Sequence, residues 1–224
     1  KPGLVSSNVD TQTYIFLADV IRQPAAPPGV PATWGVDNSV AQGATNLPRP
    51  ADYEMDSGII AQFGEQAVRD ALRHHPTISI VMDPDDLWNE SRDPAIGGIY
   101  PNPYGGTGNQ FVPGQGEPRD WERPASAEFM GFPKVPGRQV NCGIRIGGNY
   151  ARHPNRYKHH LRLTFRRQYG PGRLRAPLFS RTSVDTFDNL ILRGGNSESW
   201  TFPASAGNGT TTRANVQYIR DQFY

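Results

Sequence analysis

Two segments of this chain alternate apolar side chains with polar side chains or glycine, and this pattern constrains the fold more than any other feature. The apolar positions are Cys142, Ile144 and Ile146 in the first segment and Leu161, Leu163 and Phe165 in the second. Alternation with a period of two indicates β-strands that place one face on a core. The second segment turns Arg162, Thr164 and Arg166 to its other face, which we expect to meet solvent or a ligand.

The remaining pattern predicts an α+β fold. Further strands are predicted over 13–17, 77–82, 125–130 and 187–192, and helices over 59–72 and 214–224. The chain has 24 glycines and 21 prolines, which favours short strands and long Pro/Gly-rich loops, above all over 101–118. Because helices between successive strands are missing, we expect a mostly antiparallel or mixed β-sheet with few helices.

The chain divides into three parts on this reading. Residues 1–23 have the pattern of the last strand of a preceding β-sandwich module, residues 24–75 form a linker with one helix, and residues 76–224 form a truncated domain. The chain begins with Lys1 and carries no secretory signal, so we expect a processed chain or a piece of a longer one. No apolar run approaches the roughly 20 residues that span a bilayer.

Basic residues are concentrated in one segment although the net charge is only +2. Between Arg138 and Arg181 the sequence has many Arg and Lys residues and no Asp or Glu. A fold that gathers this segment on one surface attracts anions, with phosphate as the obvious candidate. The alternative is that these arginines are the solvated outer faces of strands.

Four basic residues, three of them in this segment, are candidate phosphate contacts. They are Lys158, Arg145, Arg162 and Arg193. Lys158 opens a strand and supplies a point charge, whereas Arg145 and Arg162 share the polar face. Arg193 precedes Gly194, where backbone can approach an anion closely. The alternatives are a Lys158 in solvent at the end of its strand, and for Arg193 structural pairing with Asp188 or Glu198.

Other chemistry is weakly indicated. The single cysteine, Cys142, excludes an internal disulfide and is expected in the core. Adjacent histidines at 74–75 and 159–160 point in different directions, and the aspartates at 83, 85 and 86 are typical of a turn. We therefore predict no metal site and no catalytic residue in this chain.

Six short strings, in order along residues 76–224, resemble the CotH-type (spore coat protein H-like) family of secreted atypical protein kinases. The strings are Ile78–Val81 with Gly98–Tyr100, Trp121–Glu128, Gly143–Gly148 with Arg152, Lys158–Arg166 with Tyr169–Gly170, Leu178–Phe179 with Phe187–Arg193, and Tyr218–Phe223. Residues 1–75 resemble what precedes this domain in large bacterial envelope proteins.

The resemblance implies a kinase N-lobe-like fold and ATP-dependent phosphorylation of secreted proteins, with Mg²⁺. The family's catalytic and metal-binding aspartates follow the last string, so they are expected outside this chain. The resemblance therefore implies the N-terminal, nucleotide- and phosphate-binding side of such a kinase, which is incomplete for catalysis. ATP and Mg²⁺ belong to the full family domain, and no cofactor is expected for this chain alone.

Two other functions stay open. A CotH-like half-domain without catalysis would serve as a structural or interaction subunit of a bacterial envelope or multiprotein complex. A carbohydrate- or anion-binding module of an extracellular protein would stack sugars on aromatic residues such as Trp34, Trp88, Trp121 and Trp200. We expect a protein partner over the truncated face. We expect no nucleic acid and no membrane span, and a secreted, periplasmic or envelope location.

Overall fold

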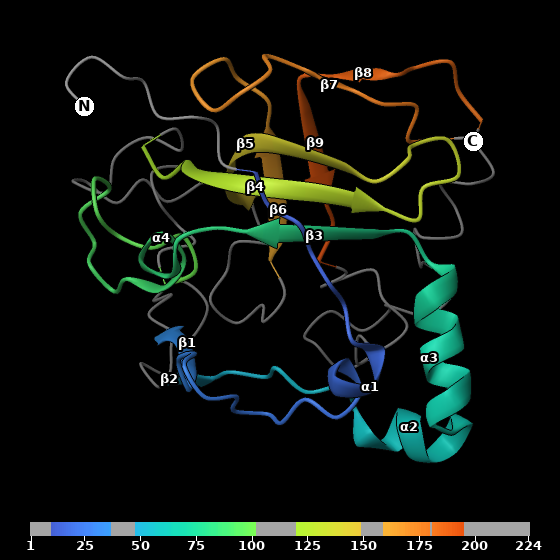
Figure 1. Cartoon of the computed structure of the whole chain (residues 1–224). Coiled ribbons are helices and arrows are strands. Elements are labelled where there is room, and N and C mark those ends of the chain that lie inside the picture. The colour runs from blue at the N-terminus through green and yellow to red at the C-terminus, as the bar shows by residue number, and fades with distance from the viewer. Residues whose placement is uncertain (1–9, 37–47, 102–119, 149–158, 180, 195–224) are drawn as a thin grey trace, which may run out of the picture.

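The structure is built on a curved antiparallel sheet of five strands in the order β3-β4-β5-β6-β9 (Figure 1). The computed structural model describes residues 10–36, 48–101, 120–148, 159–179 and 181–194. The strands of this sheet are β3 (Thr77–Val81), β4 (Arg123–Met130), β5 (Arg138–Gly147), β6 (His160–Thr164) and β9 (Asn189–Leu192). The α+β class with few helices and an antiparallel sheet is therefore confirmed.

The central strand β5 is longer than its neighbour β6, and this difference shapes the candidate site. β4 pairs with β5 from Ile144 back to Arg138, whereas β6 pairs only with residues Gly143–Gly147. Within the described chain, the first half of β5 thus has a sheet partner on one side only. The segment after β6 runs along the open side, where the Arg138 Nη1 donates to the Arg175 carbonyl at 2.6 Å.

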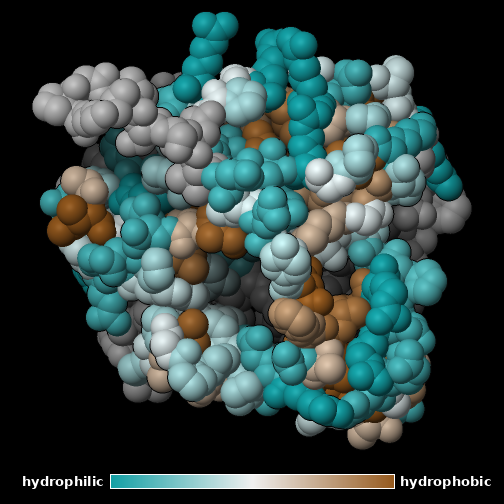
Figure 2. Space-filling view, viewed as in Figure 1, coloured by the Kyte–Doolittle hydropathy of each residue, from teal (hydrophilic) through white to brown (hydrophobic). Residues whose placement is uncertain are grey.

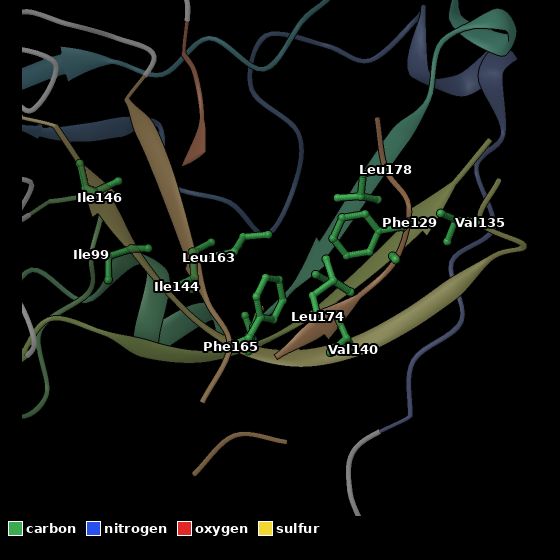
Figure 3. Packing of buried hydrophobic residues seen from close by; sticks show 14 residues of the cluster. Ile99, Phe129, Val135, Val140, Ile144, Ile146, Leu163, Phe165, Leu174 and Leu178 are labelled. Carbon is green, nitrogen blue, oxygen red and sulfur yellow. The ribbon is translucent and has the colours of Figure 1, made fainter. Parts of the chain in front are cut away.

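The core lies on the face of the sheet that the alternation predicts. Phe129, Cys142 and Leu163 are fully buried there, which confirms the prediction for the cysteine. Figure 3 shows Leu174 and Leu178 on a crossing segment packed against this face, beside Phe129 and Val140. Burial of these side chains removes apolar surface from water and supplies the main stabilisation of the sheet.

The helix predicted over 59–72 is two helices. They are α2 (Ser57–Phe63) and α3 (Glu65–His74), which leads directly into β3. The break falls at Gly64, which has a φ of +82°. This angle lies outside the helical range, and glycine tolerates it better than any other residue. Periodicity alone could not reveal it, because the apolar spacing continues across the glycine.

Two predicted strands also differ from the structure. No strand forms over 13–17, because α1 (Leu17–Val20) begins there and Thr13 bonds to side chains of the sheet instead of a backbone edge. The strand predicted over 187–192 is divided at Asp188. Its first part, β8 (Thr186–Phe187), pairs with β7 (Leu174–Arg175), and its second part is β9.

The N-terminal segment lies across the polar face of the sheet (Figure 1). The Thr13 amide donates to Glu128 Oε2 at 2.7 Å, and its hydroxyl donates to Ser79 Oγ at 2.9 Å. Thr11 hydrogen bonds to Ser126 in the same way. Side-chain hydrogen bonds to β3 and β4 therefore hold this segment in place.

Aromatic side chains connect the short sheet of β1 (Thr33–Val36) and β2 (Pro48–Pro50) to the rest of the molecule. The ring centroid of Trp34 lies 5.4 Å from that of Tyr53 and 5.6 Å from that of Tyr100. The ring centroids of Tyr100 and Trp88 are 5.1 Å apart. The two pairs that Trp34 makes are edge-to-face, an arrangement that stabilises beyond the burial of the rings themselves.

The remaining predictions of organisation are not settled by these elements. The division of the chain at residues 23 and 75 stays a prediction. Residues 102–118 of the predicted loop and the helix predicted over 214–224 lie outside the described residues.

Candidate functional site

The sheet brings two of the four predicted phosphate contacts together. Arg145 on β5 lies directly opposite Arg162 on β6, so both occupy the polar face. Arg162 Nη2 donates to Asn189 Oδ1 at 3.2 Å on the neighbouring strand. Arg193 directly follows β9, and Lys158 lies outside the described residues.

A buried carboxylate lies beside this basic face. The Glu122 side chain is 1% exposed, and its Oε2 lies 3.8 Å from Arg145 Nε and 3.5 Å from Arg166 Nη2. A buried carboxylate is costly unless opposite charges compensate it, and two guanidinium groups from different segments do so here. Arg145 is thus engaged in an internal ion pair, which the sequence did not predict.

Tyr169 and Gly143 complete the surroundings of Glu122. A Cβ atom at Gly143 would lie 2.4 Å from Tyr169 Cε2 and 2.7 Å from Glu122 Oε1, so the ring and carboxylate pack directly on the β5 backbone. Burial, and then the negative charge of Glu122, raises the pKa of the Tyr169 hydroxyl. The same two causes raise the pKa of the Cys142 thiol to about 12, so this thiol stays protonated and unreactive at neutral pH.

A cavity of about 580 Å³ opens beside the first half of β5, which does not pair with β6. We call it the arginine pocket. Its lining residues are Arg138, Gln139, Val140, Arg167, Pro171, Gly172, Arg173, Leu174 and Arg175. Among the described residues that line it, four are arginines and none is Asp or Glu.

The arginines of the pocket come from its two walls. Arg138 belongs to β5, and the others belong to the segment that follows β6. Arg167 is held close to the chain, since a Cβ atom at Gly172 would lie 3.1 Å from its Cγ. Arg173 pairs with Asp188 at 2.9 Å, but both side chains are more than half exposed. Such an exposed pair is weak and yields readily to another anion.

Sequence reasoning missed the arginine pocket and Glu122. The arginines were visible only as part of the acid-free basic segment, which extends well beyond the pocket. Glu122 precedes a strand, and nothing in its neighbourhood along the chain indicates that Arg166 reaches it. Both features arise where segments distant in sequence meet.

The other candidate residues have structural roles. Asp83 caps α4 (Pro84–Trp88) by accepting from the Asp85 amide at 2.9 Å, and Asp86 lies 3.3 Å from the buried Arg123. In the described part of the chain, no group of three His, Cys, Asp or Glu side chains is arranged to hold a metal ion. Trp34 and Trp121 are buried, so their rings offer no open face to a sugar.

No helix within the described residues combines the length and the apolar character needed to cross a bilayer. A comparison of the chain with known protein families, with curated proteins and with solved structures finds no match.

Proposed function

We propose that this chain binds a phosphate-bearing ligand at the arginine pocket. The observation that carries the proposal is the convergence of Arg138, Arg167, Arg173 and Arg175 on one cavity, with no carboxylate among its described lining residues. Arginine presents a planar fork of N–H donors that matches the oxygens of a phosphate. Like charges gathered in a concave site repel one another, so an anion between them is favoured by every one of the arginines.

The size of the pocket favours a ligand with more than one phosphate group. Its volume of about 580 Å³ lies within the usual range of small-molecule sites. A cavity of this volume can hold a chain of phosphates, which offers more oxygens to the four arginines than a single phosphate does. The triphosphate of a nucleotide is such a ligand.

The CotH resemblance favours ATP as the nucleotide, and we propose that the chain is the phosphate-binding part of a CotH-like secreted kinase. The antiparallel sheet of five strands is compatible with a kinase N-lobe. Mg²⁺ prefers carboxylate and other oxygen ligands. The described lining of the arginine pocket supplies no carboxylate, so this pocket does not fit the metal of the family.

Calorimetry with inorganic tripolyphosphate and with ATP tests the proposal. Arg138→Gln and Arg167→Gln are each expected to weaken binding about tenfold, because each removes a charge-assisted hydrogen bond. Arg92→Gln is the matched control, since Arg92 is exposed and does not line the pocket. Equal affinity of all three variants, or no binding by the wild type, would overturn the proposal.

A role as an interaction subunit is the second candidate, and a different observation favours it. Tyr14 and Phe16 are 76% and 69% exposed and line a hollow of about 540 Å³ beside α1. Figure 2 shows apolar residues around a hollow below the sheet, near the position of α1 in Figure 1. Exposed apolar groups of this kind are typical of protein contacts. If the purified chain binds neither tripolyphosphate nor ATP, the interaction role is the function that we propose.

A further inference from the structure

The buried carboxylate of Glu122 lies outside the arginine pocket but is connected to one of its walls. Glu122 is not among the lining residues, and its side chain is 1% exposed. Its connection to the pocket runs through Arg166, whose Nη2 lies 3.5 Å from the carboxylate. Arg166 is followed directly by Arg167, which lines the pocket.

Arg166 begins a tight turn that is fixed to the sheet at this point. The amides of Tyr169 and Gly170 both donate to the Arg166 carbonyl, at 3.0 and 3.1 Å. The Tyr169 ring packs over Gly143, where a side chain would leave it no room. The turn is therefore held at both of its ends, by the ion pair of Arg166 and by the contact of Tyr169 with β5.

The turn determines where the part of the second wall nearest to it lies. Arg167 is within it, and Pro171 and Gly172 follow directly and line the cavity. The opposite wall belongs to β5, which is fixed by its pairing with β4. The distance between Arg167 and Arg138 across the cavity thus depends on how firmly the turn is held against β5.

From this geometry we infer that Glu122 is a positioning residue for the arginine pocket. It holds the 166–170 turn against β5 through Arg166 and so sets the spacing of the arginines that bind the phosphate ligand. The inference rests on the function proposed for the pocket. Glu122 is suited to this role because a buried carboxylate without its cations is strongly unfavourable, which makes displacement of the turn costly.

Neutralising Glu122 distinguishes a positioning role from a direct effect of its charge on the affinity for the ligand. Glu122→Gln removes one negative charge near the pocket, and by charge alone it tightens the binding of every anion. If Glu122 positions the turn, the same variant weakens binding, because the spacing of Arg167 and Arg138 is lost. The two roles therefore predict changes of opposite sign.

The first measurement is calorimetry with inorganic tripolyphosphate on the whole chain. Glu122→Gln is expected to bind about tenfold more weakly than the wild type, the equivalent of roughly one lost charge-assisted hydrogen bond. Glu65→Gln is the matched control, because Glu65 forms an exposed ion pair with Arg22 far from the pocket in sequence. Unchanged or tighter binding by Glu122→Gln would overturn the inference.

The second measurement does not need a ligand. Hydrogen exchange of the Tyr169 and Gly170 amides is expected to accelerate at least about tenfold in Glu122→Gln, while the amides of the β4·β5 ladder keep their protection. Unchanged exchange at these two amides would refute the anchoring role. If the wild type binds no tripolyphosphate, the proposed function fails, and this measurement still decides whether Glu122 holds the turn.

A second variant guards against loss of the fold. Arg166→Gln breaks the same ion pair from its more exposed side, where the side chain is 33% exposed. If Glu122→Gln does not fold, faster exchange of Tyr169 and Gly170 in Arg166→Gln supports the inference. Wild-type exchange in that variant contradicts it.

Discussion

Gly143 shows how one residue joins the core, the buried charge and the sheet. It is the first residue of β5 that pairs with β6, and the Glu122 carboxylate and Tyr169 ring occupy the space where a side chain would stand. Neither neighbour is the free end of a flexible chain, because Glu122 is buried and Tyr169 belongs to a tight turn. The position therefore requires glycine for reasons of space and not of backbone angle.

We expect Gly143→Ala to destabilise the protein by about 1–3 kcal/mol, the usual cost of forcing an extra group into a packed site. Urea unfolding at neutral pH measures the change. Gly137→Ala is the control, because no atom lies within 4 Å of a Cβ built at that glycine. If both variants have the same free energy of unfolding, the close packing at Gly143 is incorrect.

The roles of single residues were predictable only where periodicity fixes them. Cys142 falls on the apolar phase of a clear alternation, so its burial followed from the sequence. Arg145 and Arg162 fall on the opposite phase, so their shared face also followed. Glu122 has no such pattern around it, and its burial depends on Arg166 and Tyr169, which lie far along the chain.

At the scale of elements, β6 begins with a histidine whose ionisation affects stability. Burial, and then the positive charge of Arg193, lowers the pKa of the His160 imidazole. The folded state thus favours the neutral ring, whereas the unfolded chain takes up a proton near the ordinary histidine pKa of about 6.5. Below that pH the unfolded state binds more protons, so the stability from this group is lost as the pH falls through the folded-state pKa.

We therefore expect His160→Gln to reduce the loss of stability that the wild type undergoes between pH 7.5 and pH 5.5. Urea midpoints at the two pH values measure the effect. His74→Gln, at an exposed site on α3, is the matched comparison. A pH dependence in His160→Gln as steep as that of the wild type would show that His160 does not contribute.

The elements were predicted better in type than in extent. The strands of the central sheet formed where alternation indicated them, because one buried face imposes the period of two. The breaks at Gly64 and Asp188 were missed, since an apolar pattern can continue through a point where the backbone changes direction. The segment over 13–17 formed no strand, because Thr13 bonds to side chains of the sheet and a helix begins at Leu17.

Across the whole molecule, Arg123 ties a long connection to the sheet. Its guanidinium is buried, and it donates to the carbonyls of Asp120, Pro94 and Gly97 at 2.8, 2.7 and 2.6 Å. Its Nε also lies 3.3 Å from Asp86. One side chain at the start of β4 thus holds Asp86, the 94–97 segment and Asp120 together.

We expect Arg123→Met to cost about 3–5 kcal/mol, since it leaves a partly buried carboxylate and three carbonyl groups without their donor. Chemical unfolding gives the value. Arg92→Met, an exposed arginine in the same connection, should remain near wild type. A loss below about 1 kcal/mol for Arg123→Met would mean that water replaces the guanidinium at no great cost.

The sequence by itself determined which face of β5 and β6 is apolar, because side chains alternate along any strand and only one phase could be buried. It also determined that basic residues follow one another without acids between Arg138 and Arg181. Only the tertiary structure decided that β6 ends at Thr164, opposite Gly143 of β5, and that the following turn is held by Glu122 beside the open edge of β5. The arginine pocket exists for that reason, since a cavity depends on where separate segments meet and not on the pattern within any one of them.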